Sequence, residues 1–244
     1  VCAQFFWQLV LSYCWEPLGI LNYIVIQLYA DELRSSSPVY FGDFMTTQFN
    51  NNNNNIDKNS ALLVMDFQTT ILNNFLPQDR AEDVIRNTSS LISATRAAGI
   101  PIIYVSVEFR EGYPEVSQNN IIFSSIKDNG ILITNSESSA IHDDIFPQEN
   151  EIVIIKRRVG AFSFTELEMV LRTQGIETLI LAGVTTSGVI LSTVSQAFDL
   201  DYRLVIASDC CADPDHDTHV FLLEKILSQH AVVTSSSEIS KYWV

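Results

Sequence analysis

The chain has 244 residues, of which 47% are hydrophobic, and this is enough for one sizeable α/β domain with an extension. Lysine and arginine total 14 against 29 aspartates and glutamates, which gives a formal net charge of -15 at pH 7. Because an acidic surface repels nucleic-acid phosphates and anionic lipid headgroups, we expect no nucleic-acid partner and disfavour a membrane role. None of the four cysteines forms a CxxC pair, which predicts buried thiols in a reducing, cytoplasmic compartment.

Residues 1–59 differ in composition from the rest of the chain. The apolar runs 5–15 and 18–30 are each shorter than the ~20 residues that span a bilayer, and no signal-peptide pattern precedes them. A membrane tether, a packing or partner segment and a translation irregularity all stay open for this region. Six consecutive asparagines, 50–55, predict a flexible linker. We therefore expect an apolar extension and linker over 1–59 and one domain over 60–244.

Beyond the linker, short segments rich in valine and isoleucine alternate with amphipathic ones. We expect six strands, over 61–65, 101–107, 152–155, 178–182, 203–207 and 231–234. Between them we expect helices over 80–98, 165–174, 187–200 and 217–229. Thr165 and Glu168 form a predicted capping box for the second of these helices. The segment 108–150 shows little regular pattern. Repeated βα units with non-alternating apolar strands predict an α/β fold, in which helices cover both faces of a parallel sheet.

Three polar features follow predicted strands directly. Asp66 comes after the first strand, Lys156 after the third and the turn 185–188 after the fourth. Because the carboxyl ends of parallel strands share one edge of the sheet, we expect these features to converge. Each alone has an ordinary explanation, as a helix cap, an exposed lysine or a capping turn. The combination is more specific than its parts.

Three segments carry a family resemblance: ALLVMDFQ at 61–68, IIKRRVGAFSFTELEMVLR at 154–172 and LILAGVTTSGVILSTVSQAFDLDYRLVIASDCCAD at 179–213. In order and spacing they resemble the isochorismatase-like, or cysteine hydrolase, superfamily. The resemblance covers about Ser60 to Thr234. It implies a Rossmann-like three-layer α/β/α fold with a six-stranded parallel sheet.

The resemblance also implies roles for individual residues. Asp66 and Lys156 match the aspartate and lysine of the family's amidases, whereas the position of their nucleophilic cysteine falls on Val189. A non-proline cis peptide bond is implied at Val184–Thr185, and the N–H groups of Thr185 and Val189 match the oxyanion hole.

A valine at this position closes the route through a thiolate, since its side chain cannot attack a carbonyl carbon. Ser187 lies two places earlier on the turn, and Cys210 and Cys211 follow a different strand, so none is favoured as a substitute. The isochorismatases of the superfamily also lack the cysteine, and the resemblance implies that their aspartate acts as a general acid on a vinyl ether. That role requires a protonated Asp66 near neutral pH, which burial favours and Lys156 opposes.

We therefore expect a hydrolase for a small substrate that is anionic or carries an amide, with Asp66 as general acid/base and Lys156 as its electrostatic partner. The candidate substrate-binding residues are Phe67, Arg110, Tyr113, Phe162, Thr185, Thr186, Ser187 and Val189. The alternative, which Val189 favours, is a non-catalytic member that binds a small molecule or supports an assembly.

No cofactor is expected, because no GxGxxG motif follows the first strand. No metal is expected either, because the segment after the second strand lacks histidine and the pair His216 and His219 has no evident third ligand. By analogy with the family we expect a homo-oligomer.

Overall fold

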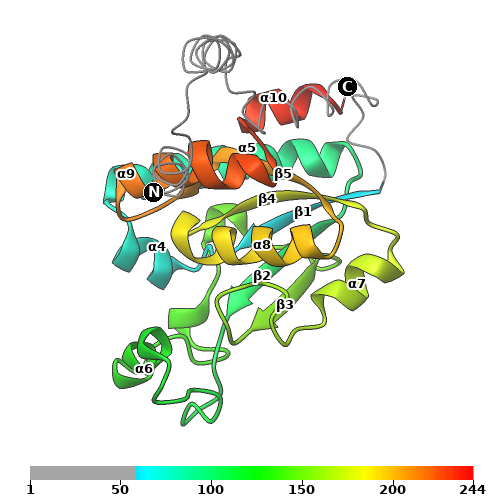
Figure 1. The fold of residues 1–244 in the computed structure, drawn as a ribbon. Coiled ribbons are helices and arrows are strands. Elements are labelled where there is room, and N and C mark those ends of the chain that lie inside the picture. The colour runs from blue at the N-terminus through cyan, green and yellow to red at the C-terminus, as the bar shows by residue number, and fades with distance from the viewer. Residues whose placement is uncertain (1–58, 244) are drawn as a thin grey trace, which may run out of the picture. The chain divides into compact units, whose positions relative to one another are not determined.

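A computed structural model of the protein describes residues 59–243 (Figure 1). The predicted extension and asparagine linker therefore lie, except for Asn59, outside the described residues. No helix within 59–243 has the length and hydropathy that crossing a membrane requires.

The described residues form a six-stranded sheet in which every neighbouring pair is parallel. Its strands are β1 (Ser60–Met65), β2 (Ile102–Val107), β3 (Ile152–Lys156), β4 (Thr178–Val184), β5 (Arg203–Ala212) and β6 (Val232–Thr234), in the order β3-β2-β1-β4-β5-β6. Every residue of β1, β2 and β4 is buried, which explains why these strands read as continuous apolar runs. The predicted α/β fold with a six-stranded parallel sheet is confirmed.

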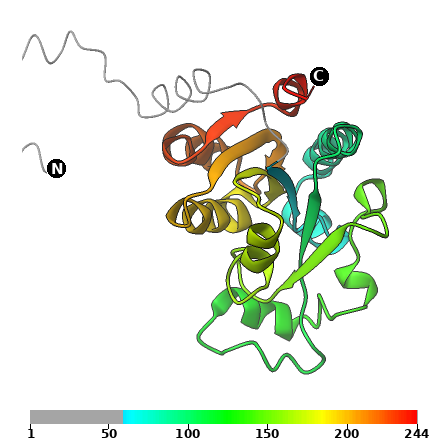
Figure 2. The same cartoon turned by 90° about the vertical axis from the view of Figure 1, so that its right-hand side faces the viewer.

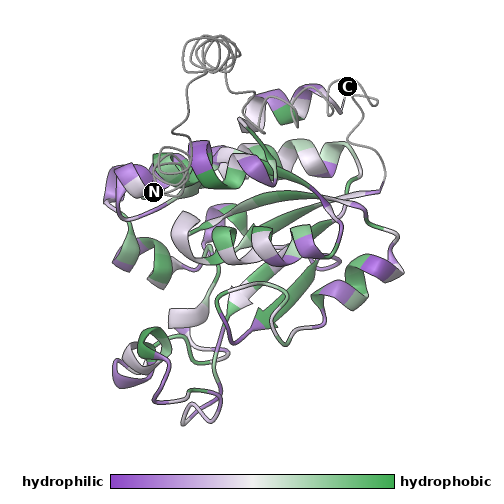
Figure 3. Ribbon diagram, viewed as in Figure 1, coloured by the Kyte–Doolittle hydropathy of each residue, from purple (hydrophilic) through white to green (hydrophobic). Residues whose placement is uncertain are grey.

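Helices cover both faces of the sheet (Figure 2). One face packs against α4 (Thr69–Phe75), α5 (Gln78–Ala97) and α10 (Ser236–Lys241). The other packs against α7 (Leu167–Thr173), α8 (Leu191–Asp199), η4 (Leu222–Ile226) and η5 (Leu227–Gln229). Figure 3 shows the strands as largely hydrophobic and the helices as mixed, as expected for helices with one face on a core.

The end of β5 differs from the expectation. The polar pair at 208–209 predicted a strand that stops at residue 207, but β5 continues to Ala212 after an irregularity in its register with β4. Asp209 lies within the strand, and its carboxylate accepts hydrogen bonds of 2.7 Å from the backbone N–H and the hydroxyl of Ser236. This tertiary role, which holds the start of α10, explains a charged residue inside a strand.

The predicted capping box before α7 is wrong. The N-cap position is Glu166, whose side chain makes no capping hydrogen bond. Thr165 donates its hydroxyl hydrogen to the backbone oxygen of Ala161 over 2.6 Å, and its oxygen accepts from the N–H of Leu167 over 3.4 Å. The threonine therefore reaches the start of the helix, but not through the reciprocal pair with Glu168 that a capping box requires.

The remaining helices also differ from the expectation in detail. The predicted helix over 187–200 begins as a π-helical turn, η3 (Thr186–Ile190), and the one over 217–229 divides into α9 (His216–Phe221), η4 and η5. The segment 108–150 contains α6 (Ile121–Asp128), η1 (Glu137–Ser139) and η2 (Asp143–Ile145).

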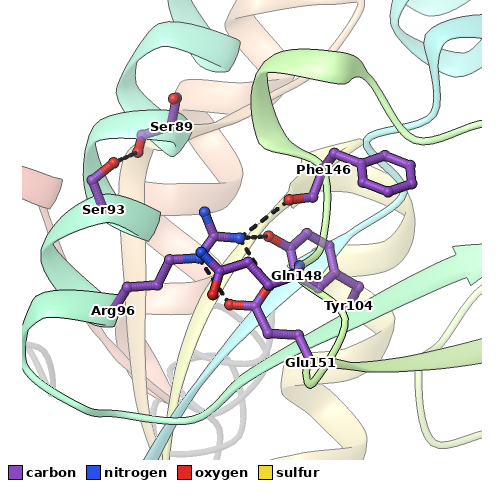
Figure 4. Close-up of polar contacts among 7 residues, drawn as sticks. All are labelled: Ser89, Ser93, Arg96, Tyr104, Phe146, Gln148 and Glu151. Atoms are coloured by element: carbon purple, nitrogen blue, oxygen red, sulfur yellow. Dashed lines mark hydrogen bonds and ion pairs between the residues drawn. The ribbon is translucent and has the colours of Figure 1, made fainter.

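Arg96, near the end of α5, fastens the end of this segment to the helix layer (Figure 4). Its guanidinium donates to both carboxylate oxygens of Glu151 over 2.9 and 2.8 Å. It also donates to the Tyr104 hydroxyl over 3.2 Å and to the Phe146 backbone oxygen over 3.1 Å. A bidentate arginine–carboxylate pair is a geometrically specific link, so it fixes the entry into β3.

The central position of β4 generates a stability prediction. Ile180 is fully buried in β4, so we expect Ile180→Ala to lower the free energy of unfolding by about 2–5 kcal/mol. Ile121 is 84% exposed, and we expect the same substitution there to change it by less than about 0.5 kcal/mol. Urea unfolding followed by circular dichroism measures both, and equal losses would contradict the central placement of β4.

Candidate active site

The crevice of a doubly wound sheet lies where two adjacent strands lead the chain in opposite directions. In this sheet those strands are β1 and β4, since β1 is followed by β2 on one side and β4 by β5 on the other. Asp66 follows β1 directly, and Thr185 follows β4. Both predicted features therefore lie at the switch point.

Asp66 and Lys156 form a buried ion pair across the end of β2. Lys156 Nζ lies 2.7 Å from Asp66 Oδ2, and the two side chains are only 2% and 8% exposed. The sheet register explains the contact, because Met65 pairs with Val105 and Lys156, the last residue of β3, pairs with Val107. Both charges thus flank the end of the same strand, and the convergence expected from the sequence is present.

The ammonium group of Lys156 has three acceptors. Besides Asp66, Nζ donates to the backbone oxygen of Val159 over 2.8 Å and to that of Arg158 over 3.2 Å. An ammonium has three N–H groups, so each of them has an acceptor here. The two acceptors in the loop that follows β3 fix the position of the Lys156 ammonium.

The carboxyl group of Asp66 is held at one oxygen only. Oδ2 accepts from Lys156, whereas Oδ1 is buried and makes no hydrogen bond within the described part of the chain. Burial raises the pKa of Asp66 above its ordinary value, although the charge and hydrogen bond of Lys156 oppose the shift. The backbone of Asp66 has φ 60°, and its N–H donates to the Val105 oxygen over 2.9 Å. The arrangement suits a carboxylic acid that exchanges a proton at Oδ1.

The turn after β4 begins with the cis peptide bond Val184–Thr185, as the resemblance implied. The Thr185 hydroxyl oxygen accepts a hydrogen bond from the Gly188 N–H over 3.1 Å. A side chain at position 188 would place its Cβ 2.6 Å from that oxygen, so the contact requires glycine. The next residue, Val189, is 2% exposed and packs into the core beneath α8.

Two side chains from beyond β5 hold this turn, and sequence reasoning did not assign them. The Ser187 N–H donates to Asp213 Oδ2 over 2.7 Å. A hydrogen bond of 2.8 Å joins the Thr186 hydroxyl to Nδ1 of His219. Asp213 closes the segment that carries the family resemblance, but neither residue's spacing indicated contact with the turn.

Within residues 59–243, no group of three or more histidine, cysteine, aspartate or glutamate side chains is arranged to hold a metal.

Gln68 is a further structural residue that the sequence did not single out. It is fully buried, donates to the backbone oxygens of Val107 and Ser139 over 2.9 and 3.1 Å, and accepts from the Val107 N–H over 3.0 Å. These bonds fasten the residues after Asp66 to the end of β2.

The other predicted binding residues have their own partners. Phe67 is 2% exposed and belongs to the core under α4 and α5, and the half-buried Phe162 packs against Tyr202 with ring centroids 5.9 Å apart. Tyr113 is buried, and its hydroxyl donates to the Ile131 oxygen over 2.8 Å. The side chain of Arg110 is 65% exposed and pairs with Glu115. Arg110 and Tyr113 thus direct their polar atoms to partners within the segment 108–150.

The two described cysteines are unsuited to nucleophilic chemistry. Cys210 and Cys211 are buried free thiols, as the composition predicted. Burial raises the pKa of Cys210 to about 12 and that of Cys211 above its ordinary range. Neither thiol forms a thiolate near neutral pH.

The fold and this edge define an α/β protein with a buried carboxyl–ammonium pair and a turn with a cis peptide bond at the switch point of its sheet. The chain matches the model of the isochorismatase domain over residues 60–238, and it belongs to the isochorismatase family.

Known relatives agree with this assignment. The chain is 32% identical over 184 residues to the uncharacterized isochorismatase family protein YecD of Escherichia coli O157:H7, covering 75% of this chain and 95% of that protein. It is 29% identical over 162 residues to N-carbamoylsarcosine amidase from an Arthrobacter species, covering 66% of this chain and 61% of the amidase. A crystal structure of a cysteine hydrolase from Pseudomonas syringae pv. phaseolicola has the same fold, with a TM-score of 0.71, 20% identity and coverage of 77% and 94%.

The ion pair generates a prediction about protonation. We expect the carboxyl carbon of Asp66 to titrate above 3.8 in the folded protein, as measured by ¹³C NMR. Lys156→Met removes the opposing ammonium and should move the midpoint higher, whereas Lys241→Met, at a 66% exposed side chain, should not.

A raised carboxyl pKa means that the folded state binds this proton more tightly than the unfolded state. The contribution of Asp66 to stability is therefore full below 3.8 and falls as pH rises through its folded pKa. A midpoint at or below 3.8 would contradict the assignment.

Proposed function

We propose that this protein is a hydrolase for a small molecule that carries an amide or an anionic group, and that it works without a cysteine nucleophile. Asp66 is its general acid/base and Lys156 the electrostatic partner. The observation that carries the proposal is the buried pair of 2.7 Å, which leaves Asp66 Oδ1 without a protein partner among the described residues.

We assign different tasks to the two carboxyl oxygens of Asp66. Oδ2 is bound to the ammonium, so the exchangeable proton belongs on Oδ1. Because burial raises the pKa of Asp66, the acid form is favoured relative to a solvated aspartate. After the proton passes to the substrate, the carboxylate that remains is stabilised by Lys156 at no cost in reorganisation. A water molecule then adds to the electrophilic carbon of the substrate and gives a proton back to Oδ1, and the bond from that carbon to the leaving group breaks.

The turn after β4 supplies the second element of the proposed site. We assign the N–H groups of Thr185 and Val189 to the negative charge that develops on the substrate oxygen, with Thr186 and Ser187 beside them. Backbone donors fixed in this way stabilise a developing oxyanion more than flexible side chains do. Phe67, Phe162, Arg110 and Tyr113 remain our candidates for the surrounding walls.

The substrate class follows from the relatives. Among them are an N-carbamoylsarcosine amidase and a maleamate amidohydrolase, the latter from Pseudomonas putida. Both names describe the hydrolysis of small amides. Val189 stands, by the resemblance, at the position of the amidases' cysteine, and its hydrocarbon side chain leaves water as the nucleophile.

The second candidate function is non-catalytic: the same site binds a small molecule, or the domain supports an assembly. The burial of Val189 favours it, because an apolar side chain packed into the core takes the place of a reactive group.

A substrate panel separates the two functions. We expect turnover of at least one small amide or vinyl ether, and we expect Asp66→Asn to lower kcat/KM by about 10²–10⁴-fold because it removes the proton donor. The matched control is Asp83→Asn, at a side chain that is 64% exposed. Steady-state assays of purified full-length variants provide the measurement. Activity that survives Asp66→Asn would eliminate the mechanism, and no turnover across the panel would support the binding function.

Restoring a thiol tests whether the rest of the site is competent. We expect Val189→Cys to gain amidase activity, because Asp66 and Lys156, which the resemblance matches to the aspartate and lysine of the family's amidases, already form a buried pair. Val189→Ala opens the same space without a nucleophile and should gain none. The gain should disappear in the double variant with Asp66→Asn, and a gain that persists there would exclude Asp66 as the base.

A further inference from the structure

We propose that Asp213 and His219 are positioning residues, which hold the turn at 185–189 in register for the substrate through Ser187 and Thr186. The inference rests on the proposed function, because it concerns how the oxyanion donors of that site are held. Neither residue belongs to β4 or η3, so the turn is held by side chains from a separate part of the chain.

The link through Asp213 fixes one backbone donor. Asp213 is buried, and its Oδ2 accepts from the Ser187 N–H over 2.7 Å. Asp213 is itself held, because Arg80 donates to its backbone oxygen over 3.2 Å and its Oδ1 accepts from the Asp215 N–H over 3.4 Å. A charged acceptor makes a stronger bond to a backbone N–H than a neutral one, so this link is suited to holding the turn.

The link through His219 fixes the neighbouring residue. Thr186 is fully buried, and its hydroxyl is 2.8 Å from Nδ1 of His219. The groups that face the imidazole are Asp213 from beyond β5, Arg80 from α5 and His216 from its own helix, whose ring stacks on it at 6.3 Å. Burial lowers the pKa of His219, Asp213 opposes the shift, and His216 and Arg80 add to it. The imidazole is therefore neutral near pH 7.

These links select which N–H groups stay available to a ligand. The first N–H groups of a helix have no acceptor within that helix. In η3 the Ser187 N–H is taken by Asp213 and the Gly188 N–H by the Thr185 hydroxyl. The N–H groups of Val189 and Thr185, which we assign to the substrate oxygen, are not the ones that these two acceptors engage. A displacement of the turn by about 1 Å would cost up to about 10²-fold in rate, because such donors act only in the correct geometry.

Protonation of His219 gives the positioning role a distinctive readout. A neutral ring with its hydrogen on Nε2 accepts the Thr186 hydroxyl hydrogen at Nδ1, whereas an imidazolium carries a hydrogen there and can only donate. The hydrogen bond between the Thr186 hydroxyl and Nδ1 of His219 must therefore change its direction or break at acid pH. We expect an acid limb in the kcat profile of the wild type, set by the pKa of His219.

The experiment compares four single variants and one double variant in the full-length chain. His219→Leu and Thr186→Val each remove the link, and we expect about a 10- to 100-fold fall in kcat with little change in KM. In the double variant the two effects should not add, because both break the same bond. His219→Gln keeps an acceptor without a titrating group, so it should retain kcat and lose the acid limb. His216→Gln alters the stacked neighbour, which has no bond to the turn in the structure, and is the control.

A readout without turnover separates this inference from the proposed function. The amide ¹H–¹⁵N resonances of Thr185 and Val189 should shift in His219→Leu, Thr186→Val and Asp213→Ala, but not in His216→Gln. If no substrate is turned over, the proposed function fails while these resonances still test the positioning role. Unchanged resonances in Thr186→Val, which preserves side-chain volume, would overturn it even if His219→Leu did not fold. If a substrate is turned over, the positioning role would also be overturned by a kcat–pH profile that is the same in His219→Gln as in the wild type.

Discussion

The buried pair of Asp66 and Lys156 is the constraint on which the rest of the site depends. Removing two charges from water costs several kcal/mol for each, and only close contact and complete hydrogen bonding offset that cost. The ends of β1 and β3 must therefore stay aligned on either side of β2. The register between these strands and the hydrogen bonds of Gln68 to Val107 provide that alignment. Lys156 meets the requirement with three acceptors, whereas Asp66 keeps one oxygen unused.

The second part of the site depends on the close approach of β4 to β1. Gly183 pairs with Met65, and a side chain at position 183 would place its Cβ 3.2 Å from both the Cβ and the backbone oxygen of Met65. Such contacts are tighter than ordinary packing allows, so the glycine lets the end of β4 lie against the end of β1. This brings the turn after β4 to the strand end that carries Asp66. Asp66 and the turn are thus placed by the centre of the sheet, while Asp213 and His219 bind the turn from beyond β5.

Much of this architecture could be predicted from local sequence. Continuous apolar runs such as the one in β4 identify strands buried on both faces, and the polar residue at the end of each run identifies the edge where chemistry gathers. That reasoning found Asp66 and Lys156, because each of them is recognised by its position at the end of its own strand. It failed for Asp209, since the partner that stabilises it within β5 is Ser236 in a distant helix.

The sequence by itself determined the alternation of strands and helices, the parallel sheet and the two charged residues at one edge, because periodicity and strand ends are local properties of the chain. Only the tertiary structure decided that Asp66 Oδ1 stays without a partner in the described residues, that Gln68 fastens β1 to β2, and that Asp213 and His219 hold the turn. The hydrogen bonds among these features join residues that are 26 to 39 positions apart in the chain. No periodicity encodes such contacts, since they follow from strand order, register and packing together.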